Sequence, residues 1–299
     1  MSFIKLCEAT NYFNFDNAIG VGMTGIMYKA TLPNGLFLAV KRLYYSPDLD
    51  NHFETEIKIL GRYNHRNIVP LLGFCIEEKG KDRILVYQYM SRGKLSDWLS
   101  DCDATSTKLG WPLVTRIALG VARGLCCLHH SLHMVHLSIS SECILLEENF
   151  EPRISNFGGA VFLNIHDKGT DKGFEKDVYD FGILIFELIE GKKFDQIIQS
   201  FRNINNNHGS AGFFSAIHES LIERKYEDEV SALFRTAVDC VHPFPHQRPT
   251  MLEVYRKLSN VWEGDELRQQ SLTPDQLPEL FSATISRDEI VEVTLQIQN

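Results

Sequence analysis

The sequence predicts an α+β protein of two lobes, a small strand-rich N-terminal lobe with one helix and a larger helical C-terminal lobe. In the first hundred residues, short apolar runs such as residues 37–40 and 84–89 are bounded by turn residues. From Leu95 onward, apolar residues recur mainly at helical spacing. The chain has 299 residues, 44% of them hydrophobic, which is enough to form the cores of both lobes.

One helix is expected within the strand-rich lobe. Phe53, Ile57 and Leu60 recur at helical spacing, with charged residues between them. The Pro-Asn-Gly sequence at residues 33–35 predicts a turn ahead of the strand at residues 37–40.

The C-terminal lobe is expected to be built around a central helix. Residues 178–189 are apolar on nearly every side, as in a helix buried all round. A second apolar stripe runs from Ile117 to Leu128. Residues 232–241 and 251–261 predict surface helices, and residues 202–210 a polar loop.

Composition narrows the classes of function. The formal net charge of −9 argues against nucleic acid as a partner. Seven cysteines without a C-x-x-C pair, and no Asn-x-Ser/Thr site, indicate a reducing, cytosolic setting. No apolar run approaches the ~18 residues of a membrane span. The longest, residues 181–189, carries Glu187 and is interpreted as a core helix.

A glycine-rich segment near the N-terminus is the first functional signal. Gly20, Gly22 and Gly25 form G-x-G-x-x-G, a pattern whose backbone can approach phosphates closely. A dinucleotide-binding fold would need a helix directly after it. Residues 26–31 instead predict a turn and a second strand, which argues against that interpretation.

A lysine and a glutamate follow at a suggestive spacing. Lys41 ends the sequence Leu-Ala-Val-Lys, and Glu56 lies on the predicted helix. Taken alone, both are ordinary surface charges. The segment Leu-Ala-Val-Lys resembles the Val-Ala-Ile-Lys strand of protein kinases. With the matches farther along the chain, this resemblance implies that Lys41 binds phosphate and pairs with Glu56.

Several longer segments together resemble the cytoplasmic domains of plant leucine-rich-repeat receptor-like kinases, especially their inactive members, the pseudokinases. The segments are ATNYFNFDNAIGVG, HRNIVPLLGFC, ILVYQYM, KDVYDFGILIFELIEGK and HQRPTMLEV. The resemblance covers roughly residues 8–262 and is specific, because the motifs occur in order at matching spacings.

This resemblance implies a bilobal protein-kinase-like fold with an antiparallel sheet in the N-lobe and a shortened activation segment. The implied boundaries are a juxtamembrane-like lead-in at residues 1–13, the N-lobe and hinge at 14–90, the C-lobe at 91–262 and a polar, flexible tail at 263–299. The implied nucleotide-binding residues are Gly20, Gly22, Gly25, Ala39, Lys41, Glu56, Gln88, Met90 and Leu145.

The catalytic loop of the family, H-R-D-L-x-x-x-N, reads HLSISSEC at residues 136–143. By the resemblance, Ser138 replaces the aspartate that accepts the substrate proton. Ser140 replaces a phosphate-binding lysine, and Cys143 replaces an asparagine that holds magnesium. A thiol is a poor ligand for magnesium, which prefers hard oxygen atoms.

The metal-binding D-F-G motif is also altered. Asn156 replaces its aspartate, so no magnesium site is expected. From Asn156 to Asp177 there are only 21 residues, too few for an activation loop, a substrate platform and the A-P-E motif. Arg248, the usual partner of that motif's glutamate, is expected to find a replacement such as Glu175 or to be solvated, because a buried unpaired arginine is costly.

The sequence thus predicts a domain that is not an enzyme and that regulates receptor-kinase signalling by binding receptor-like kinases or co-receptors. No cofactor is required, and ATP binding is expected to be weak and magnesium-independent, or absent. Two alternatives stay open: an atypical active serine/threonine kinase, and a decayed kinase copy without a selected role. The expected location is cytoplasmic, at the inner face of the plasma membrane if the chain belongs to a membrane receptor.

Overall fold

The computed structural model describes residues 2–46, 48–77, 82–100, 109–163, 171–191 and 226–262. The fold divides into two compact units. The first takes in Met1–Ser91 and Asn156–Ala160, and the second takes in Arg92–Ser155 and the described residues after Ala160. The predicted polar loop at residues 202–210 and the predicted tail at 263–299 lie outside the described residues.

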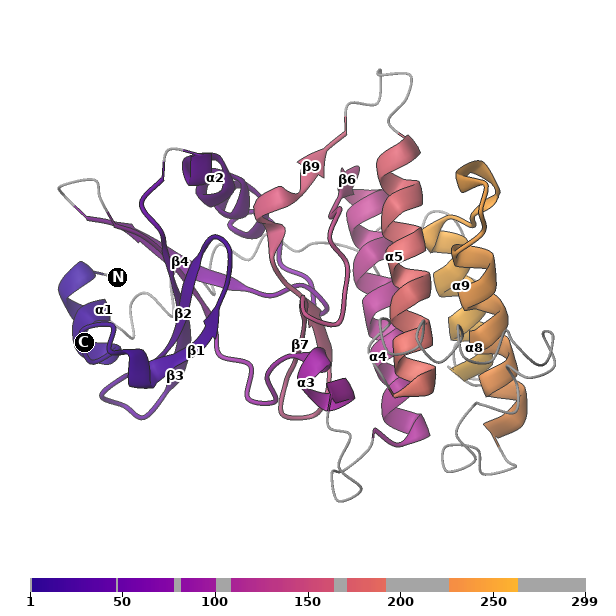
Figure 1. The fold of residues 1–299 in the computed structure, drawn as a ribbon, viewed down its shortest axis with the longest axis horizontal. Coiled ribbons are helices and arrows are strands. Elements are labelled where there is room, and N and C mark those ends of the chain that lie inside the picture. The colour runs from indigo at the N-terminus through magenta and orange to yellow at the C-terminus, as the bar shows by residue number, and fades with distance from the viewer. Residues whose placement is uncertain are drawn as a thin grey trace, which may run out of the picture. The chain divides into compact units, whose positions relative to one another are not determined.

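The first unit is built on a five-stranded antiparallel sheet with the order β1-β2-β3-β5-β4 (Figure 1). The predicted turn forms at residues 33–35, where Gly35 adopts a φ of 83° that glycine tolerates without strain. The strands are β1 (Ala18–Val21), β2 (Gly25–Thr31), β3 (Phe37–Leu43), β4 (Leu71–Ile76) and β5 (Arg83–Gln88).

Helices pack on both faces of this sheet. Successive side chains of each strand point to opposite faces, so both faces carry apolar residues that a helix can cover. The face that carries Val40 packs against α1 (Phe3–Ala9), whose Leu6 is fully buried. Part of the predicted lead-in is therefore a helix docked on the sheet. The face that carries Lys41 meets α2 (Asp48–Leu60), the helix predicted around Phe53. A 3₁₀ turn, η1 (Phe15–Asn17), leads from α1 into β1.

The second unit is mainly helical, as predicted. The helices α4, α5, α8 and α9 lie side by side (Figure 1). Among the described residues, the helices of this unit are α3 (Leu95–Ser100), α4 (Trp111–Cys126), α5 (Asp171–Glu190), α8 (Glu227–Cys240) and α9 (Met251–Trp262). Two short antiparallel pairs complete it: β6 (Met134–Val135) with β9 (Val161–Phe162), and β7 (Ile144–Leu146) with β8 (Pro152–Ile154).

The predicted central helix is α5. Its residues Phe181, Leu184, Ile185 and Leu188 are all at most 1% exposed. The helix starts at Asp171, ahead of the apolar run at residues 178–189 that predicted it.

The sequence predicted that no apolar segment reaches the length of a membrane span. This prediction is wrong, because one helix among the described residues meets the criteria of length and composition. Helix α4 continues through a π turn, η2 (Cys127–Ser131), so that Trp111–Ser131 is long and apolar enough to qualify. Of its most apolar window, 78% is buried inside the protein, as in the core helix of a soluble protein. The apolar character of α4 is therefore explained by packing.

Candidate functional site

The glycine-rich segment forms the β1–β2 hairpin, which rules out the strand–helix arrangement of a dinucleotide-binding fold. Gly22 N–H donates to the carbonyl of Gly25 at 2.9 Å across the turn. A Cβ atom on Gly25 would lie 2.3 Å from the Arg42 carbonyl oxygen, so only glycine lets β2 approach β3 here. Gly20 and Gly22 have no such close neighbour, because a Cβ atom there would meet its nearest atoms only at 3.9 and 3.7 Å.

Lys41 and Glu56 form the expected ion pair, with 2.7 Å between Lys41 Nζ and Glu56 Oε1. The Lys41 and Glu56 side chains are only 11% and 2% exposed. The second carboxylate oxygen, Oε2, accepts a hydrogen bond from the Tyr87 hydroxyl. Burial, followed by the nearby Glu56 charge, raises the pKa of Tyr87 well above its ordinary value, so the phenol stays a donor. Both oxygens of Glu56 are thus occupied within the protein.

The sequence did not single out Tyr87 as a partner of Glu56. In the β3–β5 ladder Tyr87 lies opposite Ala39, and Leu85 lies opposite Lys41. Directly opposed residues of an antiparallel pair project to the same face, and so do alternate residues along a strand. Tyr87, Ala39 and Lys41 therefore share the face that meets α2, a relation that is available only once the register is known.

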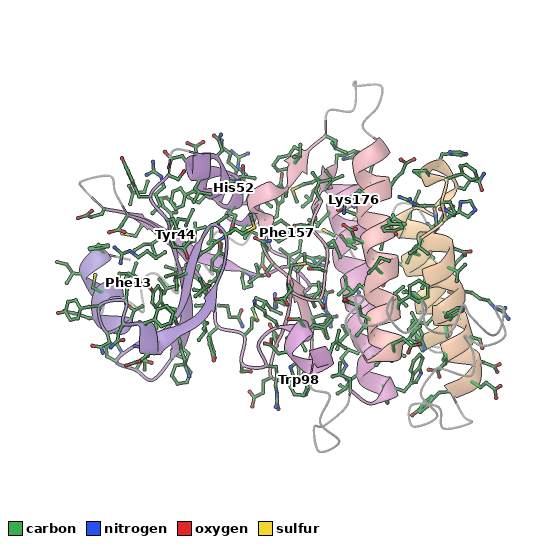
Figure 2. The ribbon with its side chains drawn as sticks, viewed as in Figure 1. Phe13, Tyr44, His52, Trp98, Phe157 and Lys176 are labelled. Atoms are coloured by element: carbon green, nitrogen blue, oxygen red, sulfur yellow. The ribbon has the colours of Figure 1, made fainter. Side chains whose placement is uncertain are left out.

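The segment that replaces D-F-G packs against α2 in the first unit. Asn156 adopts a left-handed conformation with φ of 70°, which asparagine tolerates better than most residues. Phe157 begins the turn η3 (Phe157–Gly159) and is fully buried. A Cβ atom on Gly158 would lie 2.7 Å from His52 Nδ1, so glycine permits this close contact with α2. Figure 2 labels His52 on α2 and the neighbouring Phe157. The segment keeps its structural role without its charge.

The other residues expected to contact adenine lie on three elements. Ala39 is 8% exposed on β3, and Met90, just beyond β5, is 5% exposed. Gln88 ends β5 and donates its backbone N–H to the Pro70 carbonyl at 3.3 Å. Leu145 lies on β7 of the second unit and is bridged to Lys94.

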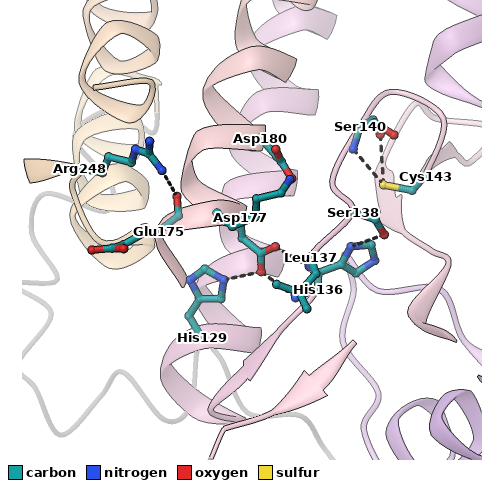
Figure 3. Close-up of polar contacts among 11 residues, drawn as sticks. His129, His136, Leu137, Ser138, Ser140, Cys143, Glu175, Asp177, Asp180 and Arg248 are labelled. Atoms are coloured by element: carbon teal, nitrogen blue, oxygen red, sulfur yellow. Dashed lines mark hydrogen bonds and ion pairs between the residues drawn. The ribbon is translucent and has the colours of Figure 1, made fainter. Parts of the chain in front are cut away.

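In the second unit, Asp177 holds the backbone of the loop at residues 136–143, which resembles the catalytic loop of kinases (Figure 3). The fully buried carboxylate of Asp177 accepts hydrogen bonds from the N–H groups of His136 and Leu137 at 2.7 and 2.6 Å. His129 Nε2 lies 2.9 Å from the same carboxylate. Leu137 is held at a φ of 68°, which is unusual for a leucine. The scaffold of the loop is therefore intact. The sequence reasoning missed His129, because its only signal was a histidine in a helical stripe.

Ser138 is an exposed residue whose hydroxyl faces a histidine. Its Oγ lies 3.5 Å from His136 Nδ1. The opposite ring nitrogen, Nε2, lies 2.9 Å from the Ser155 carbonyl oxygen, which can only accept a hydrogen bond. In the neutral ring Nε2 therefore carries the proton, and Nδ1 accepts from Ser138. A hydroxyl in this position cannot take a proton from a substrate near neutral pH, because it is not a base.

The thiol of Cys143 points inward and closes the loop on itself. Sγ donates to the Ser140 carbonyl at 3.1 Å and accepts from the Ser140 N–H at 3.2 Å. Cys143 is 3% exposed, and burial raises the pKa of its thiol from 9.0 to about 12. A buried neutral thiol is a poor magnesium ligand, and the Asn156 amide lacks the charge of a carboxylate. These residues do not fit a kinase magnesium site.

Helix α5 occupies part of the interval in which a kinase has its substrate platform. A Cβ atom on Gly173 would lie 2.9 Å from Val135 Cγ1, so the first turns of α5 lie directly on β6. The Phe174 ring contacts the His129 ring in a tilted arrangement, with 4.7 Å between centroids and 58° between planes. Residues 171–177, which in a kinase would lead from the substrate platform to the central helix, thus form the first turns of that helix here.

Arg248 has found a replacement partner, and it is Glu175 as expected, although through a different group. Arg248 Nη1 donates to the backbone carbonyl of Glu175 at 2.8 Å, and Nε donates to the His242 carbonyl at 3.0 Å. The guanidinium also lies 4.8 Å from the centre of the Tyr179 ring. Backbone carbonyls and an aromatic face therefore replace the missing carboxylate.

The comparisons with known proteins agree with this architecture. The family model for the protein tyrosine and serine/threonine kinase domain matches residues 13–176. The chain therefore belongs to the protein kinase family.

Its relatives are plant leucine-rich-repeat receptor kinases. One from Arabidopsis thaliana, named "Probably inactive leucine-rich repeat receptor-like protein kinase", is 36% identical over 88% of this chain and 49% of its own length. A "Probable inactive receptor kinase" of the same plant is 33% identical over 86% of this chain and 48% of its own. The systemin receptor of Solanum peruvianum is 33% identical over 91% of this chain and 25% of its own. The chain thus spans half or less of the length of these relatives.

Proposed function

We propose that this domain is a pseudokinase that regulates receptor-kinase signalling by binding other proteins and does not transfer phosphate. The observation that carries the proposal is the loop at residues 136–143. Asp177 holds its backbone in place, yet an exposed hydroxyl stands at position 138 and an inward, internally bonded thiol at position 143. The loop is kept as structure, and the groups that would handle the proton and the metal are gone.

The size of the expected loss supports the proposal. A general base contributes about 10²–10⁴ in rate, and electrostatic stabilisation of the transition state commonly contributes more. Ser138, Cys143 and Asn156 affect both contributions in the same reaction. Two relatives are named as probably or probable inactive kinases, which supports the proposal. Other relatives are named as receptor kinases without that word.

The names of the relatives support partners at the membrane, because they include a receptor and a receptor kinase. A kinase domain that keeps its scaffold but not its chemistry can act by occupying a surface of an active kinase. We place such partners among receptor-like kinases or co-receptors, met at the inner face of the plasma membrane.

A two-part experiment tests the proposal. Purified domain incubated with radiolabelled ATP, with Mg²⁺ or Mn²⁺, should incorporate no label into itself or into a general protein substrate. The domain should also form complexes with co-expressed plant receptor kinases, and Lys41→Arg, which keeps a positive charge beside Glu56, should leave those complexes unchanged. Label incorporation that disappears in Lys41→Arg would establish an active kinase and overturn the proposal.

A further inference from the structure

The outer edge of strand β4 is the feature that carries a further inference. Strand β4 lies at one end of the sheet and pairs with β5 alone among the described residues. Hydrogen-bonded and non-bonded pairs alternate along an antiparallel ladder. Glu77 N–H donates to the Asp82 carbonyl at 3.1 Å, so Cys75 with Ile84 is the next bonded pair. The N–H and C=O groups of Phe74 and Ile76 therefore face away from β5.

The side chains of these two residues are exposed as well. Phe74 is 48% exposed and Ile76 is 49% exposed, whereas Cys75 between them is 9% exposed on the opposite face, packed into the cluster under α1. Phe74 contacts the buried Phe53 of α2, with ring centroids 6.1 Å apart. The β4 edge, defined as Phe74 and Ile76 with their outward main-chain groups, thus offers both hydrogen bonds and apolar surface. Such an edge is a template for another strand.

The other end of the sheet is less suitable. Strand β1 also carries exposed apolar residues, Ile19 and Val21. Its pairing with β2 is irregular between Ala18 and Gly20, which interrupts the alternation of outward groups. The ladder of β4 is regular from Gly73 to Ile76. A strand that adds to this sheet is therefore expected at β4.

The chain itself contains a segment that matches this edge. In residues 291–297, which lie outside the described residues, Val291, Val293, Leu295 and Ile297 alternate strictly with Glu292, Thr294 and Gln296. A strict period of two predicts a strand with one apolar face and one polar face. The segment also contains three β-branched apolar residues and neither proline nor glycine.

We propose that residues 291–297 add as a sixth strand to the β4 edge of the same chain. The main-chain groups of Phe74 and Ile76 would then pair with the segment, and its apolar face would cover their side chains. Residues 263–290 form the tether after α9, and 28 residues at about 3.3 Å each can span roughly 90 Å. The inference is independent of whether the domain transfers phosphate.

Hydrogen exchange of the Phe74 and Ile76 amides, measured on the full chain, tests the proposal. Those amides should exchange at least tenfold more slowly in the full chain than in a chain that stops after Ser286. The double variant Val293→Lys with Leu295→Lys should lose this protection. The matched double variant Thr294→Lys with Gln296→Lys adds the same charge on the opposite face and should keep it. Equal exchange rates in all four proteins would overturn the proposal.

Two further measurements separate the possible occupants. Sedimentation at several concentrations should show that the protected protein is a monomer. Protection that appears only in a dimer would mean that two copies exchange the segment, and it would overturn the proposal for a single chain. The exposed Val238 on helix α8 provides a surface control, because Val238→Lys should leave the exchange of Phe74 and Ile76 unchanged, whereas Ile76→Lys should accelerate that of Phe74. Slow exchange of the β1 amides in place of the β4 amides would also contradict the proposal.

Discussion

The two regions that a kinase uses for chemistry, the lysine–glutamate pair of the first unit and the catalytic loop of the second, differ in this chain. In the first unit, Lys41 and Glu56 are paired at 2.7 Å and reinforced by Tyr87. In the second unit, the backbone of residues 136–143 is held by Asp177, but a hydroxyl stands at position 138 and a thiol at position 143, where the resemblance implies the groups that act on the proton and the metal. The difference teaches that buried contacts that hold the fold can be present without the chemical groups that phosphate transfer needs.

The largest expected effect concerns the pair in the first unit. Glu56→Ala leaves the buried Lys41 ammonium without its partner and should lower the free energy of unfolding by about 3–5 kcal/mol. Glu54→Ala is the matched control on the same helix, because Glu54 is 61% exposed and its ion pair with the exposed Lys58 is worth about 0.3–0.5 kcal/mol. Urea unfolding measures both. Equal losses would show that the Lys41–Glu56 pair does not stabilise the fold.

The next effect concerns the buried carboxylate of the second unit. Asp177→Asn keeps the shape but turns one acceptor toward the His136 and Leu137 N–H groups into a donor, which should cost about 1–3 kcal/mol. Asp239→Asn is the control, since Asp239 is half exposed and pairs with the exposed Lys257. Thermal unfolding should separate the two variants. An Asp177→Asn variant as stable as the wild-type protein would contradict the view that Asp177 stabilises the fold through this loop.

A smaller effect is the contribution of Cys143 to stability at alkaline pH. Burial raises the pKa of this thiol from 9.0 to about 12, so the folded state holds its proton more tightly than the unfolded state. The stability is therefore fully present below pH 9 and is lost as the pH rises from 9 toward 12. Cys143→Ser removes the titrating group, so the free energy of unfolding should depend less on pH between 7.5 and 10. Near pH 9.5 the wild-type protein should have lost about 1 kcal/mol more than the variant, relative to pH 7.5, as measured by urea unfolding. If the free energy of unfolding changes with pH in the same way in both proteins, the buried thiol does not contribute this pH dependence.

The smallest expected effect is that of nucleotide on the wild-type domain. ATP at 1 mM should stabilise the fold by less than about 1 kcal/mol, because the positions that hold magnesium carry a thiol and an amide. The thermal shift should be the same with and without Mg²⁺. The triple variant Ser138→Asp, Cys143→Asn and Asn156→Asp should gain a magnesium-dependent shift. A large magnesium-dependent shift in the wild type would refute the proposed weak binding.

How far the sequence could predict the structure is clear from particular residues. Short apolar runs bounded by turn residues predicted the strands around residues 37–40 and 84–89. The long apolar run at residues 178–189 predicted the central helix, because a helix buried on all sides is apolar on nearly every side. Sequence reasoning underestimated the apolar length of α4, since the π turn at Cys127–Ser131 extends the helix beyond the expected pattern. It also did not foresee that α1 would dock on the sheet.

The sequence alone determined which chemical groups this protein lacks, since no fold can turn Ser138 into a base or Asn156 into a carboxylate. It also determined that the interval from Asn156 to Asp177 is short. The tertiary structure decided what the remaining groups do instead: Tyr87 bonds to Glu56, Cys143 turns inward, and Arg248 pairs with the Glu175 carbonyl. Each of these contacts joins residues whose distance and direction depend on strand register, loop closure or helix packing, and these are fixed only when the whole chain folds.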